Sequence, residues 1–298
     1  MYFCVETIQY NLMAARVDFY QALRGLIDQI PQGWVSTPID LADALGDRRA
    51  ARAVSEALQR DELRDAAEKV VKSPPPVWKV FRDFSTDRPL LRLLEFQRVM
   101  SDRVVQEDRL SGAELIAGVD VAYAGDKAYA ACIVLDDRFE VVDSASATID
   151  VRFPYIPGYL AFREAPAVEA AAKRVSGFDV LLVNGHGVAH PRGCGLASHV
   201  GLDLEVPTIG VARRRLWGAV GAPRGDWTPL LHGDRVIGAK LSIGGRHPIY
   251  VSVGHNISLE TSIGIVRRMV RRGRLPEPLR EAHRAAEELR AKLGARRP

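Results

Sequence analysis

Three oxygen-bearing side chains stand where this chain could assemble a metal site. Asp120 lies inside the apolar run 116–121, and a carboxylate in a buried strand is costly unless it is paired or binds a cation. Glu164 and Asn184 lie on two later segments. Hard divalent cations such as Mg²⁺ prefer oxygen ligands, so convergence of the three side chains would suit metal-dependent hydrolysis of a phosphodiester. The alternative for Asp120 is a strand-end carboxylate that pairs with an arginine.

A glycine-rich turn, Asn184-Gly185-His186-Gly187, follows the apolar segment 180–183. In open α/β sheets, ligand sites gather at the carboxyl ends of strands, and glycines let the backbone approach a ligand closely. Asn184 and His186 would share a face if the strand geometry persists. The alternative is an ordinary turn with a surface histidine. His255 follows another predicted strand and could be a ligand or a general acid–base, although a lone histidine is more often structural.

A stiff loop precedes Glu164. Pro154 and Pro157 restrict its backbone. Tyr155 and Ile156 between them could form an apolar wedge of the kind that proteins insert between bases. The alternative is that both side chains belong to the core of the loop.

The elements that must position these residues lie in the second part of the chain. We predict helices over 90–109, 165–175, 195–204 and 258–272, antiparallel strands over 115–121, 128–136 and 140–149, and further strands over 180–183, 208–211, 235–243 and 249–253. Three strands followed by alternating helices and strands indicate an α/β domain with a mixed sheet.

The first part of the chain is predicted to be mostly helical. A helix over 17–30 stops at Pro31, and Thr37 can cap a helix that starts at Pro38 and ends near Gly46. Asp47 can cap a second helix over 48–58, which gives a helix-turn-helix pattern. This second helix carries Arg48, Arg49 and Arg52, as a groove-reading helix would. Three consecutive prolines at 74–76 then indicate a linker.

Composition excludes several classes of protein. Hydrophobic residues make up 47% of the 298 residues, but none of the apolar runs reaches the roughly 18 to 20 residues of a membrane span. The N-terminus lacks the pattern of a secretory signal. The three cysteines, Cys4, Cys132 and Cys194, form no C-x-x-C pair, which argues against a disulfide framework and a zinc site. We therefore expect a cytoplasmic protein without a membrane partner. We also expect a monomer.

Charge is concentrated at the C-terminus. Residues 267–298 hold eleven Arg or Lys and four Glu, which gives this segment a charge of +7. The rest of the chain carries −3, so the net charge of the whole chain is +4. A basic cluster suits phosphate contact. The alternative is a solvated, arginine-rich helix.

Several motifs in order resemble the endonuclease V family, over about residues 88 to 295. They are Gly118-Val-Asp120-Val-Ala-Tyr123, Pro154 to Glu164, Asn184 to Arg192, Ala197-Ser-His199, Val206 to Ala212, Val253-Gly-His255 and Arg274-Leu-Pro-Glu-Pro278. The resemblance implies a ribonuclease H-like fold and hydrolysis of the second phosphodiester 3′ of deoxyinosine, with Mg²⁺ or, as a substitute, Mn²⁺.

The resemblance also implies roles for individual residues. Asp120 and Glu164 would bind the metal, the loop of Pro154, Tyr155, Ile156 and Pro157 would separate the strands, and Gly185, His186, Gly187 and His190 would belong to the pocket for the extruded base. Two positions depart from the family: Asn184 stands in place of Asp and keeps an oxygen but not the charge, and Arg213 stands in place of Lys. We expect Arg213 to neutralise phosphate and His255 to assist near the metal.

Residues 17–60 resemble the DNA-binding domain of O6-alkylguanine-DNA alkyltransferases. The matching segments are Phe19 to Leu23, Ile30 to Thr37, Asp40-Leu-Ala and Ala50 to Val54. The resemblance implies that Arg52 enters the base stack when a nucleotide is flipped. The Pro-Cys-His-Arg nucleophile motif is missing, and alkyl transfer requires a thiolate, so we predict DNA binding without alkyl transfer.

These observations lead to one prediction with two alternatives. We predict a helix-turn-helix, winged-helix-like domain over 1–75, a linker over 76–87 and a nuclease domain over 88–298 that repairs deoxyinosine-containing DNA, single- or double-stranded. Catalysis would rest on Asp120, Glu164, Asn184, Arg213 and His255. The alternatives are a lesion-binding protein that does not cut, which the loss at Asn184 favours, and a ribonuclease specific for inosine in RNA.

Overall fold

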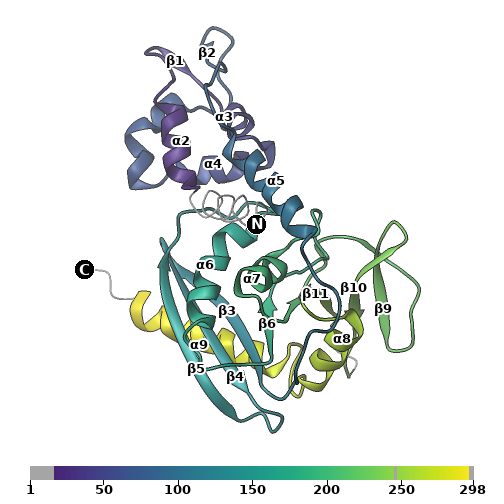
Figure 1. The fold of residues 1–298 in the computed structure, drawn as a ribbon. Coiled ribbons are helices and arrows are strands. Elements are labelled where there is room, and N and C mark those ends of the chain that lie inside the picture. Colours follow the sequence, from purple (N-terminus) through teal and green to yellow (C-terminus); the bar gives the residue numbers. More distant parts are fainter. Residues whose placement is uncertain (1–16, 245–246, 295–298) are drawn as a thin grey trace, which may run out of the picture. The chain divides into compact units, whose positions relative to one another are not determined.

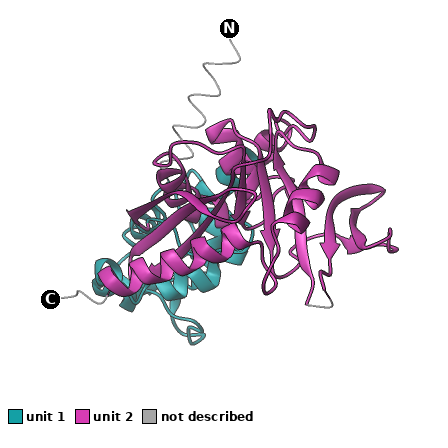
Figure 2. Ribbon diagram, turned by 90° about the horizontal axis from the view of Figure 1, so that it is seen from below, with its two compact units in different colours: residues 1–96, 152–159 teal, residues 97–151, 160–298 magenta. Residues whose placement is uncertain are grey.

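The computed structural model describes residues 17–244 and 247–294. Cys4, Arg296 and Arg297, which entered the arguments on cysteine and charge, lie outside these residues. The chain forms two compact units (Figure 2). One comprises the described residues up to Phe96 together with Arg152–Tyr159, and the other comprises Gln97–Val151 and Leu160 onward.

The first unit is built from short helices. It contains α2 (Phe19–Ile27), α3 (Pro38–Leu45), α4 (Ala51–Ala57), the 3₁₀ helices η1 (Arg48–Ala50) and η2 (Asp61–Lys69), and a pair of short parallel strands, β1 (Trp34–Val35) and β2 (Lys79–Val80). The Thr37 hydroxyl accepts a hydrogen bond from the amide of Asp40, and Gly46 ends α3 in a left-handed conformation. Asp47 then accepts from the amide of Arg49 at the start of η1. These caps lie where the sequence predicts them.

The boundary between the units differs from the predicted linker over 76–87. That segment contributes β2 to the first unit, and the Gln29 side chain exchanges two hydrogen bonds with the backbone of Ser85. The Arg82 guanidinium binds the Asp40 carboxylate at 2.9 Å. The segment is therefore part of a folded unit, because its polar groups find partners there.

The second unit is organised around a nine-stranded mixed sheet with the order β5-β4-β3-β6-β7-β11-β10-β9-β8 (Figure 1). Its strands are β3 (Ile116–Ala124), β4 (Lys127–Leu135), β5 (Val141–Asp150), β6 (Val180–Asn184), β7 (Thr208–Ala212), β8 (Ala219–Val220), β9 (Trp227–His232), β10 (Arg235–Leu241) and β11 (Ile249–His255). The first three strands are antiparallel, and β3, β6 and β7 are mutually parallel. The predicted α/β domain with a mixed sheet is confirmed. Strands β8 and β9 were not predicted.

Helices cover both faces of this sheet. Alternate residues of a strand point to opposite faces, and in β3 Ala117 and Val119 pack with α6 (Leu160–Ala172) and α7 (Leu196–Leu204). Ile116 instead belongs to the core formed with α8 (Leu259–Arg268) and the start of α9 (Glu277–Gly294). Figure 1 shows α9 lying across β3 and β4.

Two predicted helices have different ends. Helix α5 (Pro89–Ser101) stops eight residues before the predicted end at 109. The following segment is tied to the end of β11, because the amide of Val105 donates to the His255 ring and that of Arg109 to the Asn256 carbonyl. Helix α6 starts at Leu160 instead of 165, so Glu164 lies on a helix and not in a loop.

Helix α9 carries much of the basic tail. Its arginines pair with glutamates within the helix: Arg280 with Glu277, Arg284 with Glu281 and Glu288, and Arg290 with Glu287. This favours the interpretation of a solvated helix for its outer face. None of the described helices is long and apolar enough to cross a membrane.

Candidate active site

Asp120 is the centre of the site. It lies in the middle of β3 and is 8% exposed. Its Oδ1 accepts a hydrogen bond from Nδ2 of Asn184 at 2.8 Å, and its Oδ2 accepts one from Nδ1 of His283 at 2.7 Å. The pair Asp120–Asn184 follows from the parallel register, in which Val119 lies opposite Val183. The structure therefore brings together two residues that the sequence singled out.

His283 is a site residue that sequence reasoning missed. It lies on α9, which starts against β3 so closely that a Cβ on Gly118 would lie 2.3 Å from the carbonyl carbon of Pro278. Gly118 and Asp120 are two residues apart and share a face. The close approach at Gly118 thus lets the helix place His283 beside Asp120. The available signal was a glycine inside a buried strand, together with a histidine next to the apolar face of a basic helix.

Glu164 comes from α6. Its Oε1 accepts a hydrogen bond from the Tyr123 hydroxyl at 3.1 Å. The pKa of Glu164 is raised to about 7, chiefly by burial and also by the charge of Asp120, while the Tyr123 hydrogen bond and Arg163 oppose the shift. The Arg163 guanidinium stacks 4.2 Å from the centre of the Tyr123 ring. Glu164 is thus close enough to Asp120 for the two carboxylates to repel each other.

This donor set fits a divalent cation. Two carboxylates that are largely removed from water and repel each other are stabilised by a cation held between them. Because the Asn184 amide nitrogen contacts Asp120, its carbonyl oxygen is the atom that can act as a ligand. The His283 ring adds a nitrogen donor at the same carboxylate.

Arg213 follows β7 at the same edge of the sheet. Asn184 lies opposite Val211 in the parallel pair of β6 and β7. The turn after Asn184 and the residues after Ala212 therefore both follow the carboxyl ends of these strands. The Arg213 side chain is exposed, and its carbonyl accepts a hydrogen bond from the Arg274 guanidinium. An exposed cation at this edge can reach phosphate.

The structure does not bring His255 to the Asp120 cluster. In the antiparallel pair of β11 and β7, His255 lies opposite Thr208, three residues before Val211. At about 3.3 Å per residue and about 4.8 Å between strands, His255 is roughly 14 Å from Asn184. Its Nδ1 accepts from the Val105 amide. The histidine that lies beside Asp120 is His283 and not, as expected, His255.

The glycine-rich turn packs against its own neighbours. A Cβ on Gly187 would lie 1.8 Å from the Val253 carbonyl oxygen, and one on Gly185 would lie 3.2 Å from Leu196. His186 Nε2 lies 3.0 Å from the Arg214 carbonyl oxygen, and burial lowers the pKa of His186 to about 4. His190 is buried, and its Nδ1 accepts from the Arg192 amide. Gly187 is required here by the close approach of β11, and His186 is neutral at physiological pH.

The loop between β5 and α6 belongs to the first unit. Its Ile156 side chain is fully buried, and Pro154 is buried as well, whereas Tyr155 is 60% exposed and Pro157 is exposed. Of the two side chains expected to form a wedge, one is therefore a core residue and one projects from the surface.

The arginines of the predicted groove-reading helix are exposed and paired. Arg52 binds Glu56 at 2.7 Å, Arg48 lies 3.8 Å from Asp43, and Arg49 binds Asp47. Ion pairs between exposed side chains are weak. Arg48 and Arg52 can therefore exchange their partners for phosphate at little cost, whereas Arg49 is held by Asp47, whose side chain is only 9% exposed.

Comparisons with known proteins converge on one family. A sequence profile of the endonuclease V family matches residues 98–284. The endonuclease V of Roseiflexus castenholzii is 47% identical over 167 residues, which cover 54% of this chain and 75% of that protein.

Solved structures agree with this match. The Streptomyces avermitilis endonuclease V superposes with a TM-score of 0.62 at 38% identity, over 66% of this chain and 91% of that chain. The Ciona intestinalis endonuclease V, solved in complex with a 24mer DNA containing an inosine followed by a ribo-adenosine, superposes with a TM-score of 0.62 at 25% identity, over 70% of this chain and all of that one.

Proposed function

The chain belongs to the endonuclease V family, and from this premise we propose that it is a DNA repair endonuclease that cleaves on the 3′ side of deoxyinosine. The observation that carries the proposal is the contact of Asp120 with both Asn184 and His283, beside the half-buried Glu164. A relative bound to inosine-containing DNA supports the choice of substrate.

Asp120, Glu164, Asn184 and His283 would hold Mg²⁺, with Mn²⁺ as a substitute. The bound ion would supply charge neutralisation at the scissile phosphate and a water of lowered pKa. Glu164 must lose its proton to act as a ligand. Because its pKa is elevated, it loses this proton only near neutral pH. Arg213 would neutralise a phosphate oxygen from the same edge of the sheet.

The first unit would add affinity for DNA without chemistry of its own. Its exposed Arg48 and Arg52 would contact phosphate. Arg49 would lie at the base of the loop formed by residues 152–159. Burial raises the pKa of both Cys132 and Cys194 to about 12, so these two thiols are protonated and unreactive at neutral pH. Neither of these two thiols is therefore suited to accept an alkyl group, and the proposed role of the helix-turn-helix region, residues 1–75, is DNA binding without alkyl transfer.

Loss of the charge at Asn184 favours a second candidate, a lesion-binding protein that does not cut. An amide oxygen binds a hard cation more weakly than a carboxylate. We propose that cleavage survives at a reduced rate, because His283 adds a donor at Asp120. We also propose a cytoplasmic monomer, which gel filtration at several concentrations would check.

One experiment separates these candidates. The native chain, Asn184→Asp and Asp120→Asn are incubated with Mg²⁺ and a duplex that carries one deoxyinosine, with an unmodified duplex and an inosine-containing RNA beside it. We expect slow cleavage by the native chain, faster cleavage by Asn184→Asp and none by Asp120→Asn. Selective binding without cleavage by the native chain would leave the lesion-binding candidate, and preferential RNA cleavage would favour a ribonuclease.

A further inference from the structure

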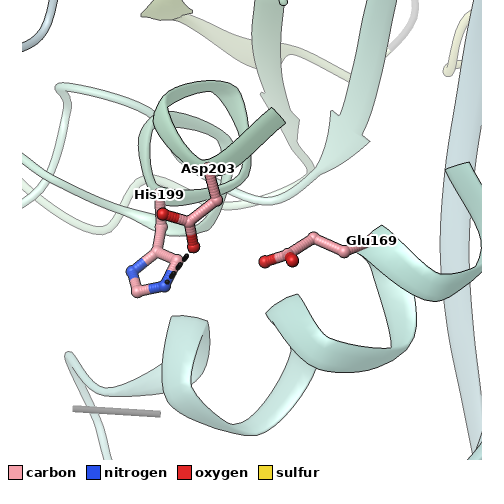
Figure 3. A group of neighbouring side chains, drawn as sticks. All are labelled: Glu169, His199 and Asp203. Atoms are coloured by element: carbon pink, nitrogen blue, oxygen red, sulfur yellow. Dashed lines mark ion pairs between the residues drawn. The ribbon is translucent and has the colours of Figure 1, made fainter. Parts of the chain in front are cut away.

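A second cluster of ligand-type side chains lies away from Asp120. Glu169 on α6 faces His199 and Asp203 on α7 (Figure 3), and one ligand atom from each lies within 4.8 Å of the others. His199 Nε2 lies 3.2 Å from Asp203 Oδ2, in the i,i+4 arrangement of one helix face. Among residues 17–244 and 247–294 this is the group of three His, Cys, Asp or Glu side chains that meets metal-site geometry.

A divalent cation can take the place of protons that this cluster holds. Burial lowers the pKa of His199 but the contact with Asp203 raises it more, and burial raises the pKa of Glu169. A neutral imidazole and two carboxylates, together −2, would hold the cation once these protons have left. Lys173 already pairs with Glu169 through Oε2 at 3.2 Å, but its side chain is largely exposed, so this pair is weak. The other Glu169 oxygen is free of that pair and, as Figure 3 shows, the carboxylate points toward His199 and Asp203.

The donor types indicate the metal. An imidazole nitrogen with carboxylate oxygens suits Zn²⁺ and similar transition metals, whereas Mg²⁺ favours oxygen ligands and retains its waters. We propose that Glu169, His199 and Asp203 form a zinc site that joins α6 to α7, separate from the site at Asp120. Three protein ligands leave a fourth position for water.

The geometry allows a metal ion to enter and the three ligand atoms to close around it. Tetrahedral Zn²⁺ at about 2.0–2.1 Å from its ligands holds them roughly 3.4 Å apart, so the donor atoms move together by about 1 Å. The flexible Glu169 side chain can supply this shift. The Asp203 side chain is 23% exposed, that of Glu169 18% and that of His199 10%, so a hydrated ion can enter from solvent.

The site would act on the helix that carries Glu164. The His199 ring packs edge-on against Phe162, with ring centres 5.5 Å apart, and Phe162 precedes Glu164 by two residues. A metal that links α6 to α7 would restrain this part of α6. The chemistry at Asp120 does not need this metal, so the two sites can be tested separately.

The test uses Co²⁺, which replaces Zn²⁺ and has visible absorption bands when tetrahedrally coordinated. Full-length Asp120→Asn protein, with the first site impaired, is titrated in excess Mg²⁺. We expect one equivalent of bound Co²⁺ with tetrahedral bands, displaced by Zn²⁺, and a rise in Tm with Zn²⁺. Adding Asp203→Asn or Glu169→Gln should remove the bands and the rise in Tm.

Controls separate a metal site from a structural ion pair. Glu205→Gln removes an exposed carboxylate two residues from Asp203 and should leave the bands and the zinc-dependent Tm unchanged. If Asp203→Asn lowers Tm equally with and without Zn²⁺, and stoichiometry stays the same, the cluster is only a structural ion pair. Absence of tetrahedral bands in folded Asp120→Asn protein would overturn the proposal as well.

Discussion

The Tyr159 hydroxyl donates a hydrogen bond to Oδ2 of Asp47 at 2.7 Å. Tyr159 ends the loop that precedes α6, and Asp47 caps the short helix η1. The same carboxylate binds Arg49, and these hydrogen bonds lower the pKa of Asp47 against the opposing effect of burial. One carboxylate therefore organises both the turn after α3 and the base of the loop expected to enter DNA.

Replacing Tyr159 by Phe should destabilise the protein. The buried ring would stay, but Asp47 would lose a partner, and a hydrogen bond to a charged group contributes about 1.5–3 kcal/mol. Urea unfolding should show a loss of this size. Tyr155→Phe changes an exposed hydroxyl in the same loop and should leave stability unchanged. Equal stability of Tyr159→Phe and native protein would show that the hydrogen bond adds nothing.

Stability without metal should fall as pH rises through the range in which Glu164 ionises. The folded-state pKa of about 7 lies above the ordinary value of 4.5. The folded state therefore retains a proton that the unfolded state releases, and stability present below about pH 4.5 is lost as pH approaches 7. The difference is on the order of 3 kcal/mol.

The comparison with Glu164→Gln isolates this effect. Urea unfolding in EDTA from pH 4.5 to 8 should give a smaller loss of stability for the variant, whose amide does not titrate. Mg²⁺ should reverse the trend in the native chain, since metal binding requires the ionised carboxylate. Parallel curves for the two proteins in EDTA would contradict the elevated pKa.

Gly118→Val should damage the site through the helix that packs on it. A Cβ at this position would overlap the backbone at Pro278, so α9 must shift and carry His283 away from Asp120. Overpacking costs about 1–3 kcal/mol, and cleavage of deoxyinosine DNA should fall by more than the loss of folded protein. Gly264→Ala is the matched control, because nothing lies within 4 Å of the added Cβ in α8. Full activity of folded Gly118→Val would exclude this role for α9.

His283→Ala should weaken metal binding without unfolding the chain. Removal of a partner that orients a ligand typically lowers metal affinity about 10- to 100-fold. Mn²⁺ binding, followed by calorimetry, should show a loss in this range. Arg284→Ala changes the neighbouring exposed residue of α9, which pairs with Glu281 and Glu288, and should keep native affinity. Similar affinities for His283→Ala and Arg284→Ala would remove His283 from the site.

The sequence predicted those parts of the site that depend on local pattern. An apolar strand interrupted by Asp120 and another that ends at Asn184 are both visible in the sequence, and parallel pairing makes them neighbours. His255 is the last residue of β11, but β11 is antiparallel to β7, so His255 lies opposite Thr208 at the start of β7 and not at its carboxyl end. Strand direction depends on tertiary pairing, which hydrophobic periodicity does not reveal.

Two further features depend on packing between distant segments. His283 reaches Asp120 because α9 lies against Gly118, a contact across more than 150 residues of sequence. Ile156 was expected in a wedge, yet it is buried in the first unit. An apolar residue in a loop has the same sequence pattern whether it packs inside or projects outside.

The loop 152–159 makes the first unit discontinuous in the chain, and this bears on any attempt to isolate the catalytic region. A fragment that begins at Gln97 would retain Phe153 and Tyr159 but lack Phe19 and Asp47, their partners. Such a fragment would expose these aromatic side chains and tend to aggregate. Weak DNA binding by it would then reflect a misfolded insertion and not the loss of an accessory module. The two units are covalently interleaved, and a single proteolytic cut after residue 96 would not release one from the other in intact form.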